Sequence, residues 1–118
     1  MERTLNICGQ DVKFKATAST TRRYRQKFQR DMFADMADLM QSAENGQLTA
    51  TALETFENVA YIMAKQGDES IPDNPDEWLD SFDMMSIYDV LPELISLWGL
   101  NEETLETPKK KVGEQSGR

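Results

Sequence analysis

The sequence predicts an α+β fold, in which a short N-terminal β-hairpin packs on a mainly α-helical bundle of about four helices. Residues 1–17 alternate apolar and polar side chains around a glycine, as in a hairpin with one buried face. Residues 19–98 instead place apolar side chains at helical spacing, with capping residues between the segments. At 118 residues the chain has the size of a single domain, and we expect one domain over residues 1–101.

The hairpin is predicted from residues 8–11, Cys-Gly-Gln-Asp, which can form a two-residue turn with Gly9 at a position of positive φ. This turn sets the opposite pairs Ile7 and Val12, Leu5 and Phe14, and Arg3 and Ala16. The apolar side chains then share one face of the hairpin. Two strands alone are marginally stable, so helices must cover this face.

A long first helix is predicted from about Ser19 to Ala43. Ser19, Thr20 or Thr21 can cap its start, and Asn45-Gly46 can end it. The apolar side chains occupy about half of its circumference. They are Tyr24, Phe28, Met32, Phe33, Met36, Leu39, Met40 and Ala43. Such a wide face either contacts both the hairpin and another helix, or leaves surface for a partner.

A second helix is predicted from Thr51 to about Gln66, since residues 51–54 have the spacing of a capping box. Its apolar face consists of Leu53, Phe56, Val59, Ala60, Met63 and Ala64. Residues 68–74 are predicted to form a loop.

Two more helices follow this loop. Asn74 as the cap and Pro75 at the first helical position predict a short third helix through Trp78, Leu79 and Phe82. The last helix has a broad apolar face between residues 87 and 98. Pro92 requires either that this helix starts only about one turn earlier, or that it kinks.

Charge is unevenly distributed along the chain, whose net charge is −8. Residues 1–30 carry eight basic and two acidic side chains, whereas residues 31–107 carry one basic and eighteen acidic side chains. Such a chain repels nucleic acid overall, but its basic end can attract an acidic partner. Alternatively, the basic and acidic segments face each other in the fold.

The candidate partner-binding residues lie on the first helix. They are Arg22, Arg23, Arg25, Lys27, Arg30, Phe28, Met32, Met36 and Met40. Cations at a helix start are unfavourable, so either acidic residues of the same domain or an acidic partner must compensate them. Nucleic acid is the weaker interpretation, because Phe28 falls on the apolar face. These methionines, together with Met84 and Met85 before the last helix, suit an adaptable binding surface, but they also suit an ordinary core.

The sequence does not predict catalysis, a metal site or a cofactor. It contains no His, and it has neither a Gly-rich phosphate loop nor a nucleophile elbow. The carboxylates of residues 73–83 lack the spacing of a calcium loop. The lone Cys8 favours a reducing compartment, and no apolar run approaches the ~20 residues of a membrane span.

The order of elements resembles the tail assembly chaperones of long-tailed bacteriophages, of the siphophage type with Gram-positive hosts. The resemblance covers most of the chain. It rests on the hairpin at 5–14, the Arg-rich helix start at 22–28, the second helix at 53–64, the acidic Trp segment at 76–79 and the helix end at 94–98. These segments match the family as a pattern and do not form a strict motif.

The resemblance implies a non-catalytic protein that binds the tape measure protein, keeps it soluble and helps to recruit the major tail protein. Its other implied partner is a frameshift-extended form of itself, and a homo-oligomer is compatible with this role. The implied location is the host cytoplasm and not the mature virion. Neither a membrane nor nucleic acid is an expected partner.

The C-terminal segment 102–118 is predicted to be a disordered tail, because it has too few apolar residues to offset its ordering entropy. It contains the candidate frameshift junction, Pro108, Lys109, Lys110 and Lys111. The resemblance suggests this role, since an adenine-rich slippery messenger is translated as a run of lysines.

Two alternative functions stay open. The excess of acidic side chains over residues 31–107 suggests a regulatory protein that mimics nucleic acid and binds a basic host protein. The basic run from Arg22 to Arg30 suggests a small nucleic-acid-binding regulator.

Overall fold

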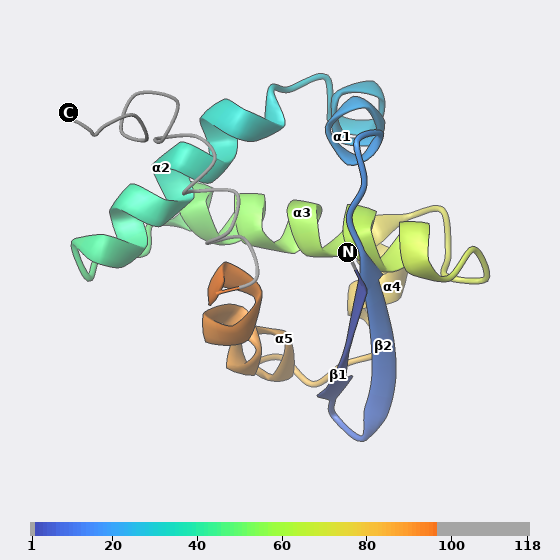
Figure 1. Cartoon of the computed structure of the whole chain (residues 1–118). Helices are drawn as coiled ribbons and strands as arrows, with labels where there is room; N and C mark the ends of the chain where they lie inside the picture. The colour runs from blue at the N-terminus through green and yellow to red at the C-terminus, as the bar shows by residue number, and fades with distance from the viewer. Residues whose placement is uncertain (1, 97–118) are drawn as a thin grey trace, which may run out of the picture.

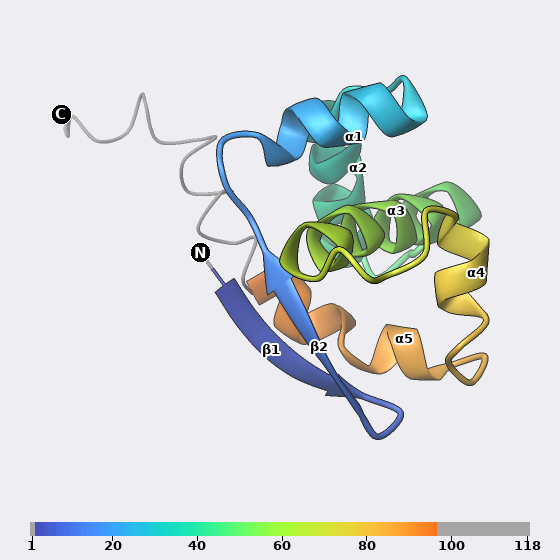
Figure 2. The same ribbon diagram turned by 90° about the vertical axis from the view of Figure 1, so that its right-hand side faces the viewer.

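The computed structural model describes residues 2–96 of the chain, and it confirms the α+β fold class. The elements are β1 (Glu2–Ile7), β2 (Gln10–Lys15), α1 (Thr20–Phe28), α2 (Met32–Glu44), α3 (Ala50–Gly67), α4 (Pro75–Leu79) and α5 (Ser86–Asp89). Figures 1 and 2 show α3 in the middle of the molecule, with α1 and α2 on one side of it and α5 on the other.

The antiparallel hairpin differs from the predicted one in register. Ile7 pairs with Gln10, so the central turn residues are Cys8 and Gly9, which both have positive φ (54° and 81°). This is the backbone of a type I′ turn, which matches the twist of the strands. Asn6 holds the turn by accepting a hydrogen bond from the Gly9 N–H (3.2 Å). A shift of two residues keeps each side chain on its face, so the buried face is as predicted: Leu5, Ile7, Val12 and Phe14.

The prediction of one helix over residues 19–43 is wrong, because the chain turns between α1 and α2. Gln29 adopts a left-handed conformation (φ 56°), which ends α1. Asp31 then caps α2, and its carboxylate accepts from the backbone N–H groups of Phe33 (2.9 Å) and Ala34 (3.4 Å). The new helix direction leaves Phe33 48% exposed, although the sequence places it on the apolar face.

The second predicted helix is confirmed as α3, but its cap is Thr49 and not the predicted Thr51. The Thr49 hydroxyl accepts from the Ala52 N–H (3.1 Å). Six consecutive residues, Val59 to Ala64, are buried, so this part of α3 is enclosed on all sides. The hairpin, α1, α2 and α4 all pack against α3, which makes it the centre of the core.

The end of α3 approaches the hairpin closely. A Cβ atom on Gly67 would lie 2.3 Å from the carbonyl oxygen of Lys13, so no other residue fits there without moving β2. Nearby, the Thr20 hydroxyl donates to Gln66 (2.7 Å), and the Gln66 amide donates to Thr17 (2.7 Å). These contacts fix the segment between the hairpin and α1 on α3.

The loop over residues 68–74 is as predicted, and the Asn74 side chain caps the third helix, α4, by accepting from the Asp76 N–H (2.8 Å). This helix ends at Leu79 and does not extend to Phe82 as predicted. The last helix is interrupted: α5 ends at Asp89, and a helical segment resumes over residues 91–96 with Pro92 in its first turn. A proline is tolerated in a first turn, so the helical segment that contains Pro92 starts just before it, and the predicted apolar face from Ile87 onward is divided between two segments. The predicted end of this helix and the tail 102–118 lie outside the described residues.

Candidate partner-binding site

The basic run over residues 22–30, on α1 and the turn that follows it, separates into engaged and exposed side chains. Arg30 and Lys27 bind acceptors on other elements, and Arg23 donates to Ser19 on its own helix (3.2 Å). Arg22 and Arg25 are exposed, and their side chains form no ion pair or hydrogen bond with residues 2–96. Compensation within the domain therefore describes Lys27 and Arg30, whereas compensation by an acidic partner stays open for Arg22 and Arg25.

Arg30 forms a bidentate ion pair with Asp35 on α2. Its Nε lies 2.7 Å from Oδ2 and its Nη2 lies 2.8 Å from Oδ1. The Asp35 side chain is 4% exposed, and the buried Tyr24 hydroxyl also donates to it (2.7 Å). The hydrogen bonds from Arg30 lower the pKa of Asp35, whereas burial, followed by the bond to Asp35, raises the pKa of Tyr24. This cluster joins α1 to α2.

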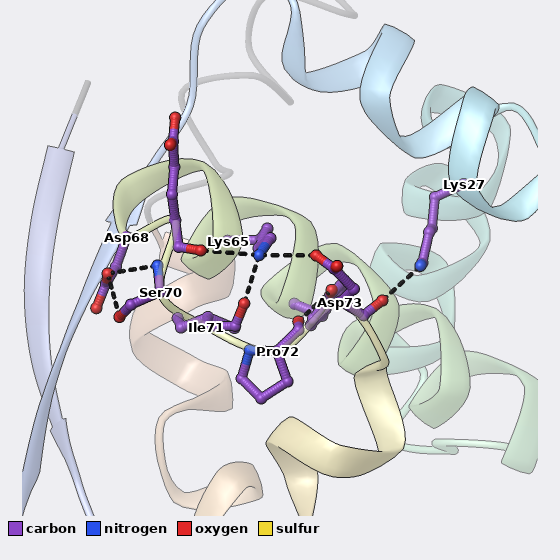
Figure 3. Close-up of polar contacts among 9 residues, drawn as sticks. Lys27, Lys65, Asp68, Ser70, Ile71, Pro72 and Asp73 are labelled. Carbon is purple, nitrogen blue, oxygen red and sulfur yellow. Dashed lines mark hydrogen bonds and ion pairs between the residues drawn. The ribbon is translucent and has the colours of Figure 1, made fainter.

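Two lysines hold the loop 68–74 (Figure 3). Lys65 donates to the carbonyl oxygens of Glu69 (2.9 Å) and Ile71, and it pairs with the Asp73 carboxylate (2.9 Å). Lys27 reaches across from α1 and donates to the carbonyl oxygen of Asp73 (2.6 Å). The bond to Lys65 lowers the pKa of Asp73. Both ammonium groups thus satisfy loop acceptors of the same chain.

The methionines of α2 belong to the core. Met32 and Met36 are buried, and Met40 is half-buried against them. Phe28 is also half-buried, and its ring packs on that of Tyr24 with centroids 5.0 Å apart. The core alternative therefore describes Met32 and Met36.

A hollow at the turn from α1 to α2 retains exposed groups of both kinds, basic and apolar. Its lining includes Arg25, Gln29, Arg30, Met32 and Phe33, and we call it the corner hollow. Asp31 also lines it, but that carboxylate caps α2. Arg22 lies one turn before Arg25 on the same face of α1. An exposed guanidinium beside an exposed aromatic ring suits a segment that carries both carboxylates and apolar side chains.

The most exposed large apolar side chains of the described chain lie between α4 and α5. Met84 is 84% and Met85 is 61% exposed. We call residues 80–85 the methionine loop, and its Asp80 and Asp83 are also exposed. The hairpin turn supports the loop, because the Gln10 side chain donates to the carbonyl oxygen of Ser81 (3.1 Å).

The sequence singled out Met84 and Met85 together with the methionines of the first helix, but it did not place this loop among the candidate partner-binding residues. Its signal was the pair of adjacent methionines between two turn-forming segments, where neither helical nor strand spacing can bury both side chains. Pro108, Lys109, Lys110 and Lys111 lie outside the described residues.

The structure offers no metal-binding arrangement within residues 2–96, where no three Cys, Asp or Glu side chains converge. Cys8 is a free, exposed thiol on the hairpin turn. None of the helices in the described range is long and apolar enough to cross a bilayer. Comparisons with protein-family models, with curated proteins and with solved structures find no match.

Proposed function

We propose that the protein is a tail assembly chaperone of a long-tailed bacteriophage. In this role it binds the tape measure protein, keeps it soluble and helps to recruit the major tail protein. The order of a hairpin, an Arg-rich helix, a central helix and an acidic Trp segment supports the proposal through the resemblance of the sequence. The single observation that carries it is the exposed Met84-Met85 pair within an acidic surface.

The chemistry of the methionine loop suits such a client. A tape measure protein presents apolar helical surface before it is enclosed in a tail, and flexible thioethers can pack on many such surfaces. The carboxylates of Asp80, Asp83 and the neighbouring α4 keep a complex of this kind soluble by charge repulsion. No catalytic step is required.

Co-expression with the tape measure protein of the same phage tests this function. The wild-type chain is expected to co-elute with its client and to keep it in the supernatant. A Met84→Ser/Met85→Ser variant is expected to lose most of the client, because it removes apolar contact area without touching the core. Leu48→Ser is the matched control, since Leu48 is also an exposed apolar side chain but lies on another loop. If the wild-type chain forms no complex with the folded client, the proposal fails.

The proposed frameshift is tested in the messenger. Synonymous recoding of Lys109, Lys110 and Lys111 is expected to impair tail assembly while the short protein stays unchanged. If recoding is silent while Lys→Ala changes are harmful, the lysines act as a binding segment and the junction proposal is wrong.

A second candidate is the acidic mimic of nucleic acid. Lys65 is the one basic residue between positions 31 and 107, and its ammonium group is bound to the loop 68–74, so the acidic surface around it has little compensation. Such a protein is expected to bind a basic host protein at low salt and to release it near 0.5 M salt, roughly, where exposed charges are screened. The nucleic-acid-binding regulator has less support, because Lys27 and Arg30 are engaged within the chain.

A further inference from the structure

We propose that a polar groove over Thr51 and Thr55 of α3 binds an extended segment of a partner protein that carries two basic side chains. The groove contains no residue of the methionine loop, and it shares only Arg30 with the corner hollow. This site goes beyond the chaperone proposal and does not depend on it. Two observations support it: a buried hydroxyl group without a partner, and two unmatched carboxylates.

Two hollows with a common floor form this groove. One, of about 290 Å³, lies between α2 and α3, and the other, of about 440 Å³, lies between α1 and α3. Thr51 and Thr55 line both hollows and lie one turn apart on the same face of α3. Because α1 and α2 pack on the same side of α3, the hollows follow each other along this helix (Figure 1). Their volumes are near the lower end of those of ligand sites, ~300–1,000 Å³, so each suits one long side chain.

Thr55 is the residue that indicates a ligand. It is 6% exposed, and its hydroxyl forms no hydrogen bond with residues 2–96. Most buried polar side chains have a hydrogen-bond partner, because they have lost their contact with water. The other two buried polar residues of the described chain follow this rule. The Thr20 hydroxyl donates to Gln66 (2.7 Å). Asp35 accepts from Tyr24 (2.7 Å). Since Thr55 lines both hollows, a group bound in the groove can supply the missing partner.

The groove also carries two unmatched negative charges. Asp38 lines the hollow between α2 and α3, Glu54 lines the one between α1 and α3, and both are exposed. Neither carboxylate forms an ion pair or a hydrogen bond within the described range. Among the described residues, Arg30 is the only basic side chain that lines either hollow, and it is already paired with Asp35. One ammonium or guanidinium group in each hollow is therefore the matching charge.

The rest of the lining favours a peptide over a free amine. Hydroxyl and amide groups surround the two carboxylates, with Gln41, Ser42 and Asn45 in one hollow and Asn58 in the other. An amide side chain both donates and accepts hydrogen bonds, and so does a peptide backbone. The methylene chain of a polyamine does neither, so it would leave these groups without partners. An extended backbone that directs one basic side chain into each hollow satisfies both the charges and the polar lining.

Titration of the full-length chain with an acetylated and amidated tetralysine peptide tests the site. The amide chemical shifts are expected to move most at residues 38–58, with a dissociation constant below about 1 mM at low salt. At about 0.5 M salt the affinity is expected to fall severalfold, because exposed charges are screened. No binding at several millimolar peptide, or shifts that move mainly at the methionine loop, overturn the proposal. The tape measure protein takes no part in this experiment, so its outcome does not affect the chaperone proposal.

Substitution of the two carboxylates tests the matching charge. Asp38→Asn/Glu54→Gln is expected to weaken peptide binding at least about fivefold, because it removes both ion pairs. The control is Asp89→Asn/Glu93→Gln, which makes the same change in net charge at exposed positions outside the groove. It is expected to bind like the wild type. Equal weakening by the two variants means that overall charge alone attracts the peptide, and it overturns the proposal. Circular dichroism melts establish that both variants fold.

Thr55→Val tests the buried hydroxyl separately from the charges. The variant keeps the shape of the side chain, so the midpoint of thermal unfolding is expected to be unchanged or raised, while the affinity for the peptide falls about threefold or more. A clear fall in the midpoint means that the hydroxyl is bonded within the fold, and this result overturns the assignment, as does an unchanged affinity. Spermidine is the last probe. Equal affinity for spermidine and for the peptide assigns the groove to free polyamines and overturns the peptide proposal.

Discussion

The turn between α1 and α2 and the exposed face of α1 contain arginines from one basic run, yet these arginines have different surroundings. Arg30 forms a bidentate pair with Asp35, whose carboxylate is buried and also accepts from Tyr24. Arg25 lies on α1, before the turn that contains Arg30, and its side chain faces solvent with no acceptor in the described chain. The difference lies in the acceptor: a buried carboxylate must be paired, whereas an exposed guanidinium need not be. Charge in this domain is therefore structural where it meets a buried group and available where it does not.

The largest effect is expected at Asp35. Asp35→Ala removes the carboxylate that accepts from both Arg30 and Tyr24. The buried Tyr24 hydroxyl is then left without its hydrogen bond. The free energy of unfolding is expected to fall by about 2 kcal/mol, as for other buried polar groups that lose their partner. Urea denaturation measures this. An unchanged midpoint would show that the Arg30–Asp35–Tyr24 cluster does not hold α1 on α2.

The same cluster predicts that the free energy of unfolding depends on pH. The folded pKa of Asp35 is lowered by Arg30, so its contribution to stability is present above the unfolded value of about 4 and is lost as the pH falls through the folded pKa. The stability gap between wild type and Asp35→Asn is therefore expected to be full at pH 7 and to narrow below about pH 4. A gap that is independent of pH between 7 and 3 would contradict an ionised Asp35 in the folded state.

A smaller effect is expected at Lys65. Lys65→Met keeps much of the apolar stem but leaves the carbonyl oxygens of Glu69 and Ile71 without their donor. We expect a loss of about 1 kcal/mol and faster amide exchange in the loop 68–74, because these carbonyls are close to water and can be partly resolvated. Hydrogen exchange of the loop is the measurement, with Lys15→Met as a control on the hairpin. Equal exchange in all three proteins would refute a structural role for Lys65.

The smallest effect on stability is expected at the exposed arginines. Arg22→Gln/Arg25→Gln should change the free energy of unfolding by less than about 0.5 kcal/mol, as is usual for surface substitutions. A substantial loss of stability would mean that these side chains have a structural partner, and the comparison with Arg30 would no longer hold.

The hairpin and the first helix show which structural features the local sequence pattern can predict and which it cannot. The alternation around Gly9 predicted the buried face correctly, but it did not distinguish Cys8-Gly9 from Gly9-Gln10 as the turn, since both registers give the same face. The apolar spacing of residues 19–43 continued through the break at Gln29. Only the cap formed by Asp31, a residue type favoured at helix starts, indicated a new helix there.

The amino-acid sequence by itself determined most of the elements, because helix caps, turn residues and apolar spacing act over a few residues, but the apolar spacing did not show the break between α1 and α2. It also determined the segregation of charge along the chain. The tertiary structure decided which charges are engaged, since the acceptor of Lys27 is Asp73, 46 positions away. It likewise decided which methionines are exposed: Met32 and Met36 are buried between helices, whereas no element packs over Met84 and Met85. Burial and pairing depend on contacts between distant segments, and those contacts exist only in the folded domain.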